Sequence, residues 1–529
     1  MTQFTWEFPY WSQRMPVLGA NVVASSQPLA AQAGLRMLLR GGNAVDAALA
    51  AAIALTVVEP TMNGIGSDAF ALIWDGSQLH GLNASGQAPR GWVPERFGGR
   101  DAMPVTGWDS ITVPGAVSAW VALSSRFGSL PFAELFAPAV EYADGGFLVS
   151  PIVARQWQAQ GPQLRDLPGF AEAFLRGGHP MHAGELFRFP AQASTLRSIA
   201  ETHGEAFYRG VLAEKIAAAS RAQGGAMTLE DLADHQPEWV EPISLSYRDM
   251  RLHEIPPNGQ GIAALIALGI LGHFPLADLP VDSADSLHLQ IEAMKLAFAD
   301  AYRYVADPGA MSVSIGQLLD ADYLKERAAL IDRARAKDFA PGRPGASDTI
   351  YLTAADSAGM MVSYIQSNYM GFGSGVVVPG TGISLHNRGA CFRLEPNHPN
   401  RVAPGKRPFH TIIPGFVMDG PRPLMSFGVM GGDMQPQGHA QIMIRLADYG
   451  QNPQAAADAP RWKVLGGRNV VLEHAVAPGV VEELARRGHI VRHAERGSLE
   501  FGAGQFIYRL SGGYLAASDP RRDGQAVGF

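Results

Sequence analysis

Apolar residues recur at helical spacing near the start of the chain. Segment 25–42 (SSQPLAAQAGLRMLLRGG) shows this spacing and ends at Gly41-Gly42, a favourable C-cap. Segment 43–58 (NAVDAALAAAIALTVV) begins with Asn43 as a candidate N-cap and is rich in alanine. We therefore expect two helices here, the second packed closely on both sides.

The pattern then alternates between strand-like and helix-like stretches. Residues 70–86 predict a hairpin, 110–240 mainly helices and loops, and 241–257 a second hairpin. Further helices are expected at 227–235, capped by Thr228, at 262–271 and at 284–305. On the last of these, Glu292 and Lys295 can pair at i, i+3, and His288 is expected to be a satisfied core or surface residue rather than a ligand.

Strand signals dominate the second half. Residues 349–355 and 360–367 predict a hairpin closed by a turn at 356–359, followed by a glycine-rich loop (NYMGFGSG). Short strands and turns come next, then helices at 438–448 and 480–487, and strands at 504–510 and 513–518. A helix-rich first half and a strand-rich second half suggest sheets sandwiched between helix layers.

Composition narrows the class of protein. A chain of 529 residues, 47% hydrophobic and 17% charged, favours a globular protein of two or more lobes. The net charge of −7, with no Lys/Arg run, argues against a nucleic-acid partner. The single cysteine, Cys391, allows no internal disulfide and no cysteine cluster for zinc, and no H-E-x-x-H motif is present.

We expect neither a secretory signal nor a membrane span. The N-terminal residues lack a basic stretch followed by an apolar one, and the most apolar run, 44–58, is short and contains Asp46. A cytoplasmic location is the expectation.

One glycine-rich stretch, 64–69 (GIGSDA), loosely matches the dinucleotide-binding fingerprint. That fingerprint needs a strand before it and a helix after it, whereas a helix precedes this one and a hairpin follows. We therefore reject a nucleotide site.

The segment 334–348 (ARAKDFAPGRPGASD) predicts a flexible linker, because its prolines and glycines break helices. Thr349 stands where this linker meets the first predicted strand. If the chain were cut between Asp348 and Thr349, Thr349 would carry a hydroxyl and a free α-amino group together. A threonine activated by its own N-terminal amine is a known nucleophile. We therefore hypothesise a self-cleavage point at Asp348–Thr349.

Nearly the whole chain resembles the γ-glutamyltranspeptidase family of N-terminal-nucleophile hydrolases. The similar segments include GGNAVDAALAAAIALTVVEP, SITVPGAVSAW, AFYRGVLAEKIA, EAMKLAFADAYRYVADP, APGKRPFHTIIP and ASDPRRDG. The family's T-x-x-x-[ST]-x-x-D start of the small subunit is matched by Thr349, Thr353 and Asp356. The resemblance implies an α+β, four-layer αββα fold. It also implies autocleavage into a large subunit, 1–348, and a small subunit, 349–529, that stay associated.

The resemblance also implies roles for individual residues. Thr349 would be the nucleophile, with Ser367 orienting or relaying its proton. Asn368 roughly matches a family asparagine, although the loop that follows differs in length and leaves Asn368 and Tyr369 as alternatives. Gly431 and Gly432 would form the oxyanion hole, a role that suits glycine because it lets the backbone approach closely.

Three departures from the family bear on the substrate. Ser85 stands in place of the arginine, and Cys391 in place of the acidic residue, that hold a glutamate head group. His410-Thr411 replace a serine pair, and a new cation, Arg388, is present. Arginine binds carboxylates through a bidentate fork. We therefore expect a small amide that bears a carboxylate, such as oxamate or a glutaryl amide, with Arg388 as its anchor or, alternatively, as a structural ion pair.

The segment GGDMQPQGH, at 431–439, looks like the acylase and oxamate amidohydrolase branch of the family. Asp433, His410 and His439 are equally open to lining the site and to bracing its loops, and Tyr369 is a further candidate for substrate contact. No cofactor or metal is expected.

Two other functions remain open from the sequence. One is a γ-glutamyltransferase or glutathione hydrolase that uses the same nucleophile. The other is an unprocessed, non-catalytic binding protein of the same fold. A cysteine nucleophile at Cys391 is a third mechanism to consider, but a buried cysteine usually serves as a small apolar residue.

Overall fold

Two seven-stranded antiparallel sheets form the centre of the computed structural model, which describes residues 14–339 and 348–529. The strand order of the first sheet is β21 (Gln525–Gly528), β2 (Val22–Ser25), β10 (Asp348–Ala355), β11 (Met361–Tyr369), β3 (Asp68–Trp74), β4 (Leu79–Asn83), β7 (Glu238–Val240). That of the second is β1 (Val17–Gly19), β20 (Gly513–Ser518), β19 (Gly504–Leu510), β15 (Arg422–Val429), β14 (Gly415–Asp419), β9 (Met250–Glu254), β8 (Ile243–Tyr247).

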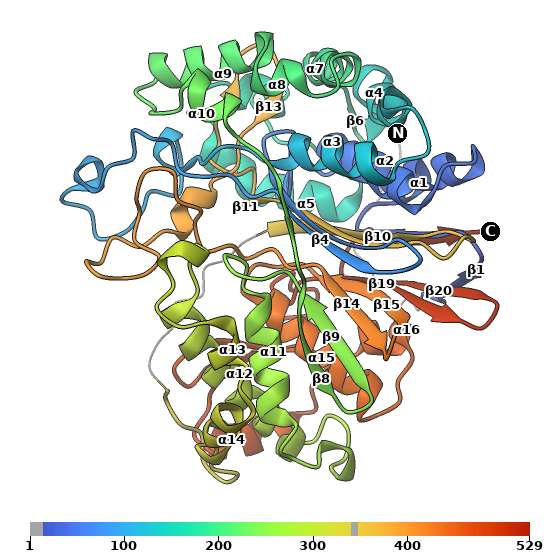
Figure 1. Cartoon of the computed structure of the whole chain (residues 1–529), viewed down its shortest axis with the longest axis vertical. Coiled ribbons are helices and arrows are strands. Elements are labelled where there is room, and N and C mark those ends of the chain that lie inside the picture. Colours follow the sequence, from blue (N-terminus) through green and yellow to red (C-terminus); the bar gives the residue numbers. More distant parts are fainter. Residues whose placement is uncertain (1–13, 340–347) are drawn as a thin grey trace.

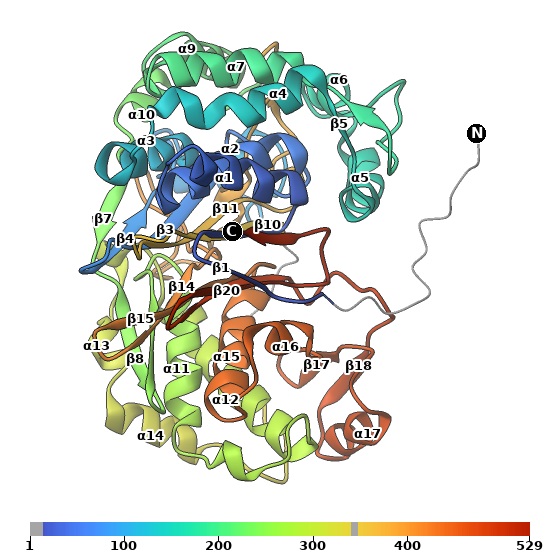
Figure 2. The same ribbon diagram turned by 90° about the vertical axis from the view of Figure 1, so that its right-hand side faces the viewer.

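The two sheets stack face to face, and helices cover both outer faces (Figures 1 and 2). The first sheet is covered by α1 (Pro28–Leu39), α2 (Ala44–Val58) and α3 (Ala116–Phe127), with α4 (Ala137–Gly145), α7 (Pro190–Glu201) and α9 (Val211–Ala222) farther out. The second is covered by α11 (Gly261–Leu271), α15 (Met434–Ala447) and α16 (Pro453–Asp458), with α12 (Ala284–Tyr304) and α14 (Ala321–Ala329) outside them. Each sheet buries one face on the other sheet and one on helices, which explains the nearly unbroken apolar runs of β3 and α2.

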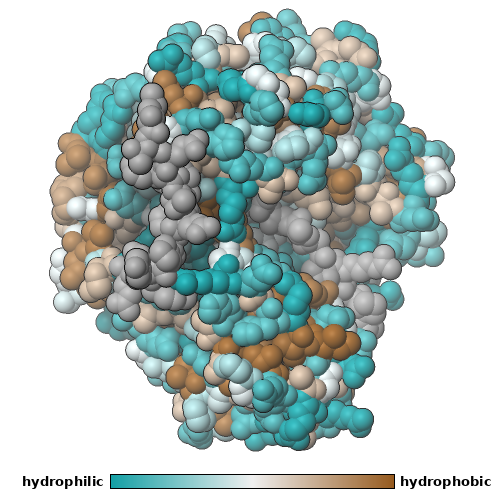
Figure 3. Space-filling view, turned by 180° about the vertical axis from the view of Figure 1, so that it is seen from behind, coloured by the Kyte–Doolittle hydropathy of each residue, from teal (hydrophilic) through white to brown (hydrophobic). Residues whose placement is uncertain are grey.

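Smaller elements complete the chain. The remaining helices are α5 (Pro151–Leu164), α6 (Phe170–Phe174), α8 (Glu205–Tyr208), α10 (Leu229–Ala233), α13 (Ile315–Leu318) and α17 (Pro478–Arg486). The remaining strands are β5 (Phe147–Leu148), β6 (Leu186–Phe187), β12 (Val377–Val378), β13 (Ile383–Ser384), β16 (Trp462–Gly466), β17 (Asn469–Leu472) and β18 (Ile490–His493). The face shown in Figure 3 is mainly hydrophilic with separate apolar patches.

Most predicted elements are present. Asn43 caps α2 and Thr228 caps α10, each in a reciprocal capping box. Lys295 Nζ lies 2.5 Å from Glu292 Oε1 in the buried face of α12, as the i, i+3 spacing predicts. His288 is buried and bonds to His489 and to the Asp332 carbonyl, which confirms its interpretation as a satisfied core residue.

Three boundaries differ from the prediction. Helix α15 begins at Met434, four residues before the predicted start, because Pro436 lies in its first turn, where no intrahelical N–H bond is lost. Strand β11 extends to Tyr369, so Asn368 and Tyr369 belong to the strand and not to the glycine-rich loop. In the predicted linker, Lys337 N–H donates to Glu292 Oε2 (3.1 Å), so this part of it is attached to the fold, and 340–347 lie outside the described residues.

The later members of the threonine motif are structural. Thr353 Oγ1 lies 2.6 Å from Ser426 Oγ and joins β10 to β15 across the two sheets. Asp356 Oδ2 accepts a hydrogen bond from Ala44 N–H (2.8 Å) at the start of α2. Together these bonds fix the hairpin that carries Thr349 against both its sheet partner and the helix layer.

Candidate active site

Thr349 is the second residue of β10 and is fully buried. Its Oγ1 lies 3.1 Å from Ser367 Oγ on β11 and 3.3 Å from Gln435 Nε2 on α15. The β10–β11 register passes from the pair Asp348–Tyr369 to the pair Ile350–Gln366, so two residues of β11 oppose Thr349 alone. This is a β-bulge, a device that re-aims a side chain at the end of a pairing.

The two residues opposite Thr349 behave differently. Ser367 Oγ contacts the threonine hydroxyl and also accepts a hydrogen bond from Tyr369 N–H (2.8 Å). Asn368 forms no hydrogen bond to Thr349, and its Oδ1 accepts from Ser67 Oγ (2.8 Å) instead. Among the residues that the structure describes, Asn368 Nδ2 has no hydrogen-bond partner. Asn368 therefore bonds to Ser67 and not to the Thr349 hydroxyl.

Gly431 and Gly432 form the turn between β15 and α15. Their φ angles are +118° and +60°, a region that non-glycine residues rarely adopt. The Gly432 carbonyl accepts from Gln260 Nε2 (2.9 Å), which also donates to the Thr411 carbonyl (2.6 Å). The turn thus sits at the positive end of a 14-residue helix, a favourable place for a developing negative charge.

Arg388 lies in a short 3-10 turn (Arg388–Cys391) and is fully buried. Its Nη1 donates to Thr411 Oγ1 (2.7 Å) and lies 3.7 Å from Cys391 Sγ. Its guanidinium carbon lies 4.4 Å from the centre of the Tyr369 ring, a cation–π contact. Within the described ranges, Nε and Nη2 have no hydrogen-bond partner and no acidic side chain pairs with the guanidinium.

A cavity of about 160 Å³ is lined by Tyr369, Cys391 and Thr411, three side chains that contact the Arg388 guanidinium, and Arg388 itself lies behind this lining. Its wall also includes Asp433 and Tyr302. Burial and then the carboxylate of Asp433 raise the pKa of Tyr302 well above its ordinary value. Asp433 and Tyr369 thus line the cavity, and the thiol of Cys391, whose pKa is raised by burial, lines it as well.

Tyr369 has a φ angle of +77°, unusual for a bulky residue. The backbone turns sharply at this residue, which directs the ring under Arg388 while the N–H reaches Ser367. Strained conformations of this kind concentrate at functional sites. Tyr369 therefore links the threonine to the cavity.

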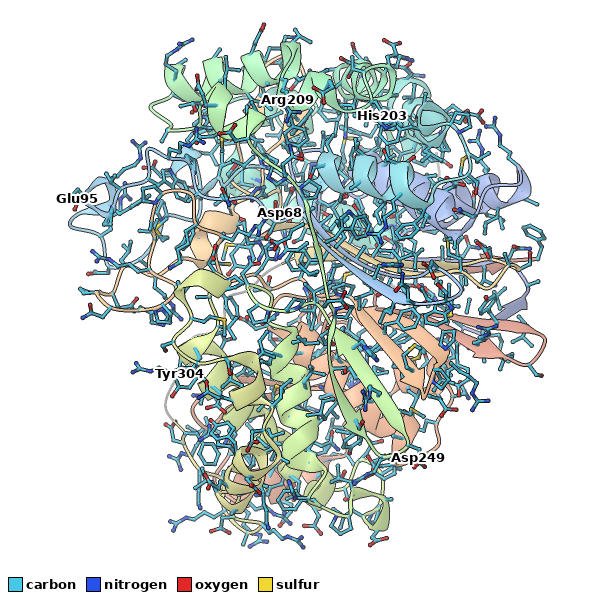
Figure 4. The ribbon with its side chains drawn as sticks, in the orientation of Figure 1. Asp68, Glu95, His203, Arg209, Asp249 and Tyr304 are labelled. Atoms are coloured by element: carbon cyan, nitrogen blue, oxygen red, sulfur yellow. The ribbon has the colours of Figure 1, made fainter. Side chains whose placement is uncertain are left out.

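His410 is buried behind the cavity wall and not part of its lining. Its Nε2 lies 3.0 Å from Asp68 Oδ2, and its Nδ1 accepts from Ile412 N–H, so Nε2 carries the proton and donates. Burial raises the pKa of Asp68 to about 7, with the Arg388 guanidinium opposing, and burial lowers the pKa of His410 well below its ordinary value. Figure 4 labels Asp68 near the centre of the molecule. His410 thus braces the wall and does not face a ligand.

The remaining candidates have structural partners. His439 lies 2.6 Å from Glu254 and accepts from Val429 N–H, so it braces α15 against the sheet. Ser85 Oγ donates to Asn83 Oδ1 (2.7 Å) and accepts from Asn258. In the rejected nucleotide motif, a Cβ at Gly64 or Gly66 would lie 2.1 or 2.4 Å from Ser384 atoms, so close packing explains these glycines.

One trio of potential metal ligands occurs among the described residues, namely His288, Glu292 and His489. His288 Nδ1 lies 2.8 Å from His489 Nε2, and Lys295 Nζ occupies the same carboxylate oxygen of Glu292 that faces His489. These side chains contact one another and lie on α12 and before β18, away from Thr349.

The sequence interpretation missed Asp68, Gln260, Gln435 and Tyr302. Asp68 lies in the segment GIGSDA, whose glycines had suggested a nucleotide site. Gln435 lies in GGDMQPQGH, in which Gly431, Gly432, Asp433 and His439 were the candidates. Neutral amides give no signal in a sequence unless their partners are known.

Comparisons with known proteins identify the family of the chain. The family model described as gamma-glutamyltranspeptidase matches residues 30–529. The chain belongs to the γ-glutamyltranspeptidase family. This is a family of self-processing N-terminal-nucleophile amidohydrolases, and its fold contains both helices and sheets, as found here.

Three relatives bear on the branch. A glutathione hydrolase-like proenzyme of Bacillus subtilis, YwrD, is 37% identical over 97% of this chain and 99% of its own. An oxamate amidohydrolase proenzyme of Klebsiella pneumoniae is 38% identical over 95% of this chain and 97% of its own. The crystal structure of a cephalosporin acylase from Bacillus halodurans is 49% identical, covers 100% of this chain and 99% of its own, and superposes with a TM-score of 0.95.

Among the described residues, every helix is too short or too polar to span a membrane.

Proposed function

We propose that this chain cuts itself between Asp348 and Thr349 and then hydrolyses a small carboxylate-bearing amide with Thr349 as N-terminal nucleophile. The observation that carries the proposal is the position of the Thr349 hydroxyl. This hydroxyl is buried at a β-bulge, where it contacts Ser367 and Gln435. Ser367 lies two residues before the cavity residue Tyr369 on β11. The folded unit is proposed to be the four-layer αββα sandwich with large subunit 1–348 and small subunit 349–529.

The first step is processing. Thr349 Oγ1 attacks the carbonyl carbon of Asp348, its proton is relayed through Ser367 Oγ to the departing nitrogen of Thr349, and the C–N bond breaks as the ester forms. Water then hydrolyses that ester. The products are the carboxylate of Asp348 and the free α-amino group of Thr349.

The second step is turnover. The new α-amino group has an ordinary pKa of about 7.7–8.0 and accepts the hydroxyl proton as Oγ1 attacks the substrate carbonyl. The backbone N–H groups of the Gly431-Gly432 turn stabilise the oxyanion, aided by the N-terminus of α15. Release of the amine leaves an acyl-threonine, which water resolves. An acceptor amine in place of water would give transfer.

Arg388 supports the substrate class. A buried cation without an anionic partner costs several kcal/mol, so a protein retains one where a ligand supplies the anion. Nε and Nη2, which have no partner among the described residues, form one edge of the fork that binds carboxylate bidentately. The cavity of about 160 Å³ has room for a small amide.

The other wall residues fit this assignment. Tyr369 supports the guanidinium through its ring, and Asp433, next to the oxyanion turn, is placed to accept an N–H of the scissile amide. At the two positions where the family's charged anchors for a glutamate head group would stand, this chain has Ser85, which bonds to Asn83, and Cys391, a thiol. An oxamate-like or glutaryl-like amide is therefore favoured over a γ-glutamyl amide.

The test combines intact mass with an amide panel. The purified protein should separate under denaturing conditions into two pieces, the smaller beginning with Thr349. Thr349→Ala should stay uncut and inactive. The cut protein should release ammonia from oxamate or aniline from a glutaryl anilide faster than aniline from a γ-glutamyl anilide.

Three results would contradict the proposal. Normal cleavage of the Thr349→Ala variant would remove Thr349 as the processing residue. Saturable turnover of the γ-glutamyl anilide alone would remove the substrate class but not the nucleophile. A chain that stays whole after long incubation would favour a non-catalytic binding protein.

A further inference from the structure

Helix α15 carries three buried glutamines, and only one of them faces the reacting threonine. Gln437 Oε1 accepts from Val464 N–H (2.7 Å), and Gln441 Oε1 accepts from Trp462 N–H (3.2 Å), so both secure strand β16. Gln435 contacts no residue of that strand. It reaches instead between Ile413 and Thr349.

The orientation of the Gln435 amide follows from its partners. Ile413 N–H lies 2.8 Å from one end of the amide and can only donate, so that end is the oxygen. The other end, Nε2, therefore points at Thr349 Oγ1 at 3.3 Å. The assignment does not depend on how the two ends were named, because the reverse orientation would oppose two N–H donors.

This polarity organises the hydroxyl of Thr349. Oγ1 accepts from Gln435, and the hydrogen bonds of the described residues offer its proton a single acceptor, Ser367 Oγ. Ser367 Oγ is in turn held by Tyr369 N–H. A threonine is already stiff about χ1, so two contacts on one oxygen define where its lone pair and its proton lie.

We propose that Gln435 is a catalytic residue that stabilises negative charge on the attacking oxygen, Thr349 Oγ1. This inference rests on the proposed function and adds a donor distinct from the oxyanion hole. The Gly431-Gly432 N–H groups serve the former carbonyl oxygen, whereas Gln435 Nε2–H serves the nucleophile itself.

The donor acts in both halves of the reaction. In acylation, the Oγ1–carbon bond forms while the Oγ1 proton moves to the base, so charge builds on Oγ1 before the bond is complete. In deacylation, the α-amino group takes a proton from water as water adds to the ester, the carbon–Oγ1 bond breaks, and its electron pair returns to Oγ1, which regains that proton from the α-ammonium group. A fixed N–H in a buried site stabilises that charge without reorganising at the moment of reaction.

The experiment compares Gln435→Met with the matched control Gln441→Met. Both variants remove a buried amide from the same helix and leave one backbone N–H of the fold unpaired, Ile413 N–H or Trp462 N–H. Only the first removes a donor from Thr349. Loss of one preorganised donor typically lowers kcat by about 10²–10³-fold, and we expect about a hundredfold here with KM within about threefold of wild type.

The readouts are the rate of self-cleavage by intact mass, and kcat and KM for ammonia release from oxamate by fully cut protein. Both rates should fall in Gln435→Met and stay within about threefold of wild type in Gln441→Met. If the two variants behave alike while Thr349→Ala remains uncut, the inference is wrong and the proposed function survives. If Thr349→Ala cleaves normally, both fall together.

A second variant covers the case in which Gln435→Met does not fold. Gln435→Glu keeps the oxygen that accepts from Ile413 N–H but donates to Thr349 only while the carboxyl is protonated. Its kcat should fall as the pH rises, opposite to a wild type that gains activity as its α-amino group loses its proton. A wild-type pH profile and kcat in Gln435→Glu would overturn the inference.

Discussion

Two arginines, Arg461 and Arg388, are both fully buried, but only Arg461 forms an ion pair with a carboxylate among the described residues. Arg461 Nη2 lies 2.6 Å from Asp519 Oδ2, and its Nη1 donates to the Phe501 carbonyl (2.9 Å), which ties β16 to the C-terminal strands. Arg388 is equally buried, yet its partners among the described residues are a hydroxyl, a thiol and an aromatic ring.

The nearest buried carboxylates report the same difference. Burial opposes ionisation of Asp519, but Arg461 and Arg521 outweigh it and lower the pKa of Asp519 to about 2. Burial raises the pKa of Asp68 to about 7, because Arg388 opposes it from too far to form an ion pair. Burial of an arginine alone therefore says little about function. Among the described residues, no carboxylate forms an ion pair with Arg388. This difference from Arg461 is the basis of the proposed binding role of Arg388.

The largest effect is expected from breaking the structural pair. Arg461→Met should lower the free energy of unfolding by about 3–5 kcal/mol, because Asp519 is left as an uncompensated buried charge. Urea unfolding at pH 7.5 measures this, with Arg422→Met as the control, since that side chain is largely exposed. Activity per folded molecule should be retained. If Arg461→Met lost activity but kept the stability of wild type, the structural role assigned to Arg461 would be wrong.

A smaller effect of a different kind is expected at the other arginine. Arg388→Met should lower kcat/KM for oxamate by about a hundredfold, from about 3 kcal/mol of lost charge-assisted binding. Its unfolding free energy should be equal to or above that of wild type, because an unpaired buried charge is removed. Steady-state kinetics and urea unfolding measure the two quantities on one sample. Destabilisation by several kcal/mol would identify Arg388 as a structural ion-pair member.

The carboxylates give a third, pH-dependent test. Between about pH 3.9 and pH 7, folded Asp68 holds a proton that the unfolded chain has lost, so its contribution to stability falls as the pH rises. Asp68→Asn removes this pH dependence. The free energy of unfolding of the variant, relative to that of wild type, should therefore rise by about 1.4 kcal/mol per pH unit between pH 4.5 and 6.5. Parallel stability curves for the variant and the wild type would contradict the raised pKa.

Asp519→Asn is the counterpart. Its contribution is present above about pH 3.9 and is lost only as the pH falls towards 2, the pKa in the folded protein. This variant should therefore be less stable than wild type by a constant amount between pH 4.5 and 6.5. Urea unfolding at three pH values separates a slope from an offset.

The smallest effect is expected at the thiol. Cys391→Ala removes the long contact from Arg388 Nη1 (3.7 Å) and the hydrogen bond between the thiol and Tyr369, and leaves the bond from Arg388 to Thr411. We expect less than about 1 kcal/mol in stability and a kcat/KM for oxamate within about threefold of wild type. Complete loss of turnover with normal folding would revive the cysteine as nucleophile.

The sequence predicted the parts of the fold that depend on local pattern. The spacing of apolar residues located α1, α2 and the β10–β11 hairpin, and capping residues such as Asn43 marked helix starts. The start of α15 was predicted late, because a proline within the first turn is a breaker in sequence but costs nothing in that position.

The site was predictable only where chemistry is carried by one residue. Thr349 was named from the linker and the threonine motif, and Ser367 from the family resemblance. Their hydroxyl oxygens lie 3.1 Å apart. His410 was a candidate for substrate contact and instead bonds to Asp68, a partner 342 positions away in sequence. Gln435 and Gln260 could not be singled out, since an amide becomes informative only when both of its ends have found partners.

The strand order has a consequence for the two proposed subunits. In the first sheet β2 lies between β21 and β10, and in the second the block from β20 to β14 lies between β1 and β9, so each sheet contains strands from before and from after Thr349. Cutting the chain before Thr349 would therefore yield two polypeptides that share one core. Dilution could not separate them without melting that core, and such a pair has no dissociation constant apart from its unfolding. Subunits expressed from two genes would have to fold together rather than dock.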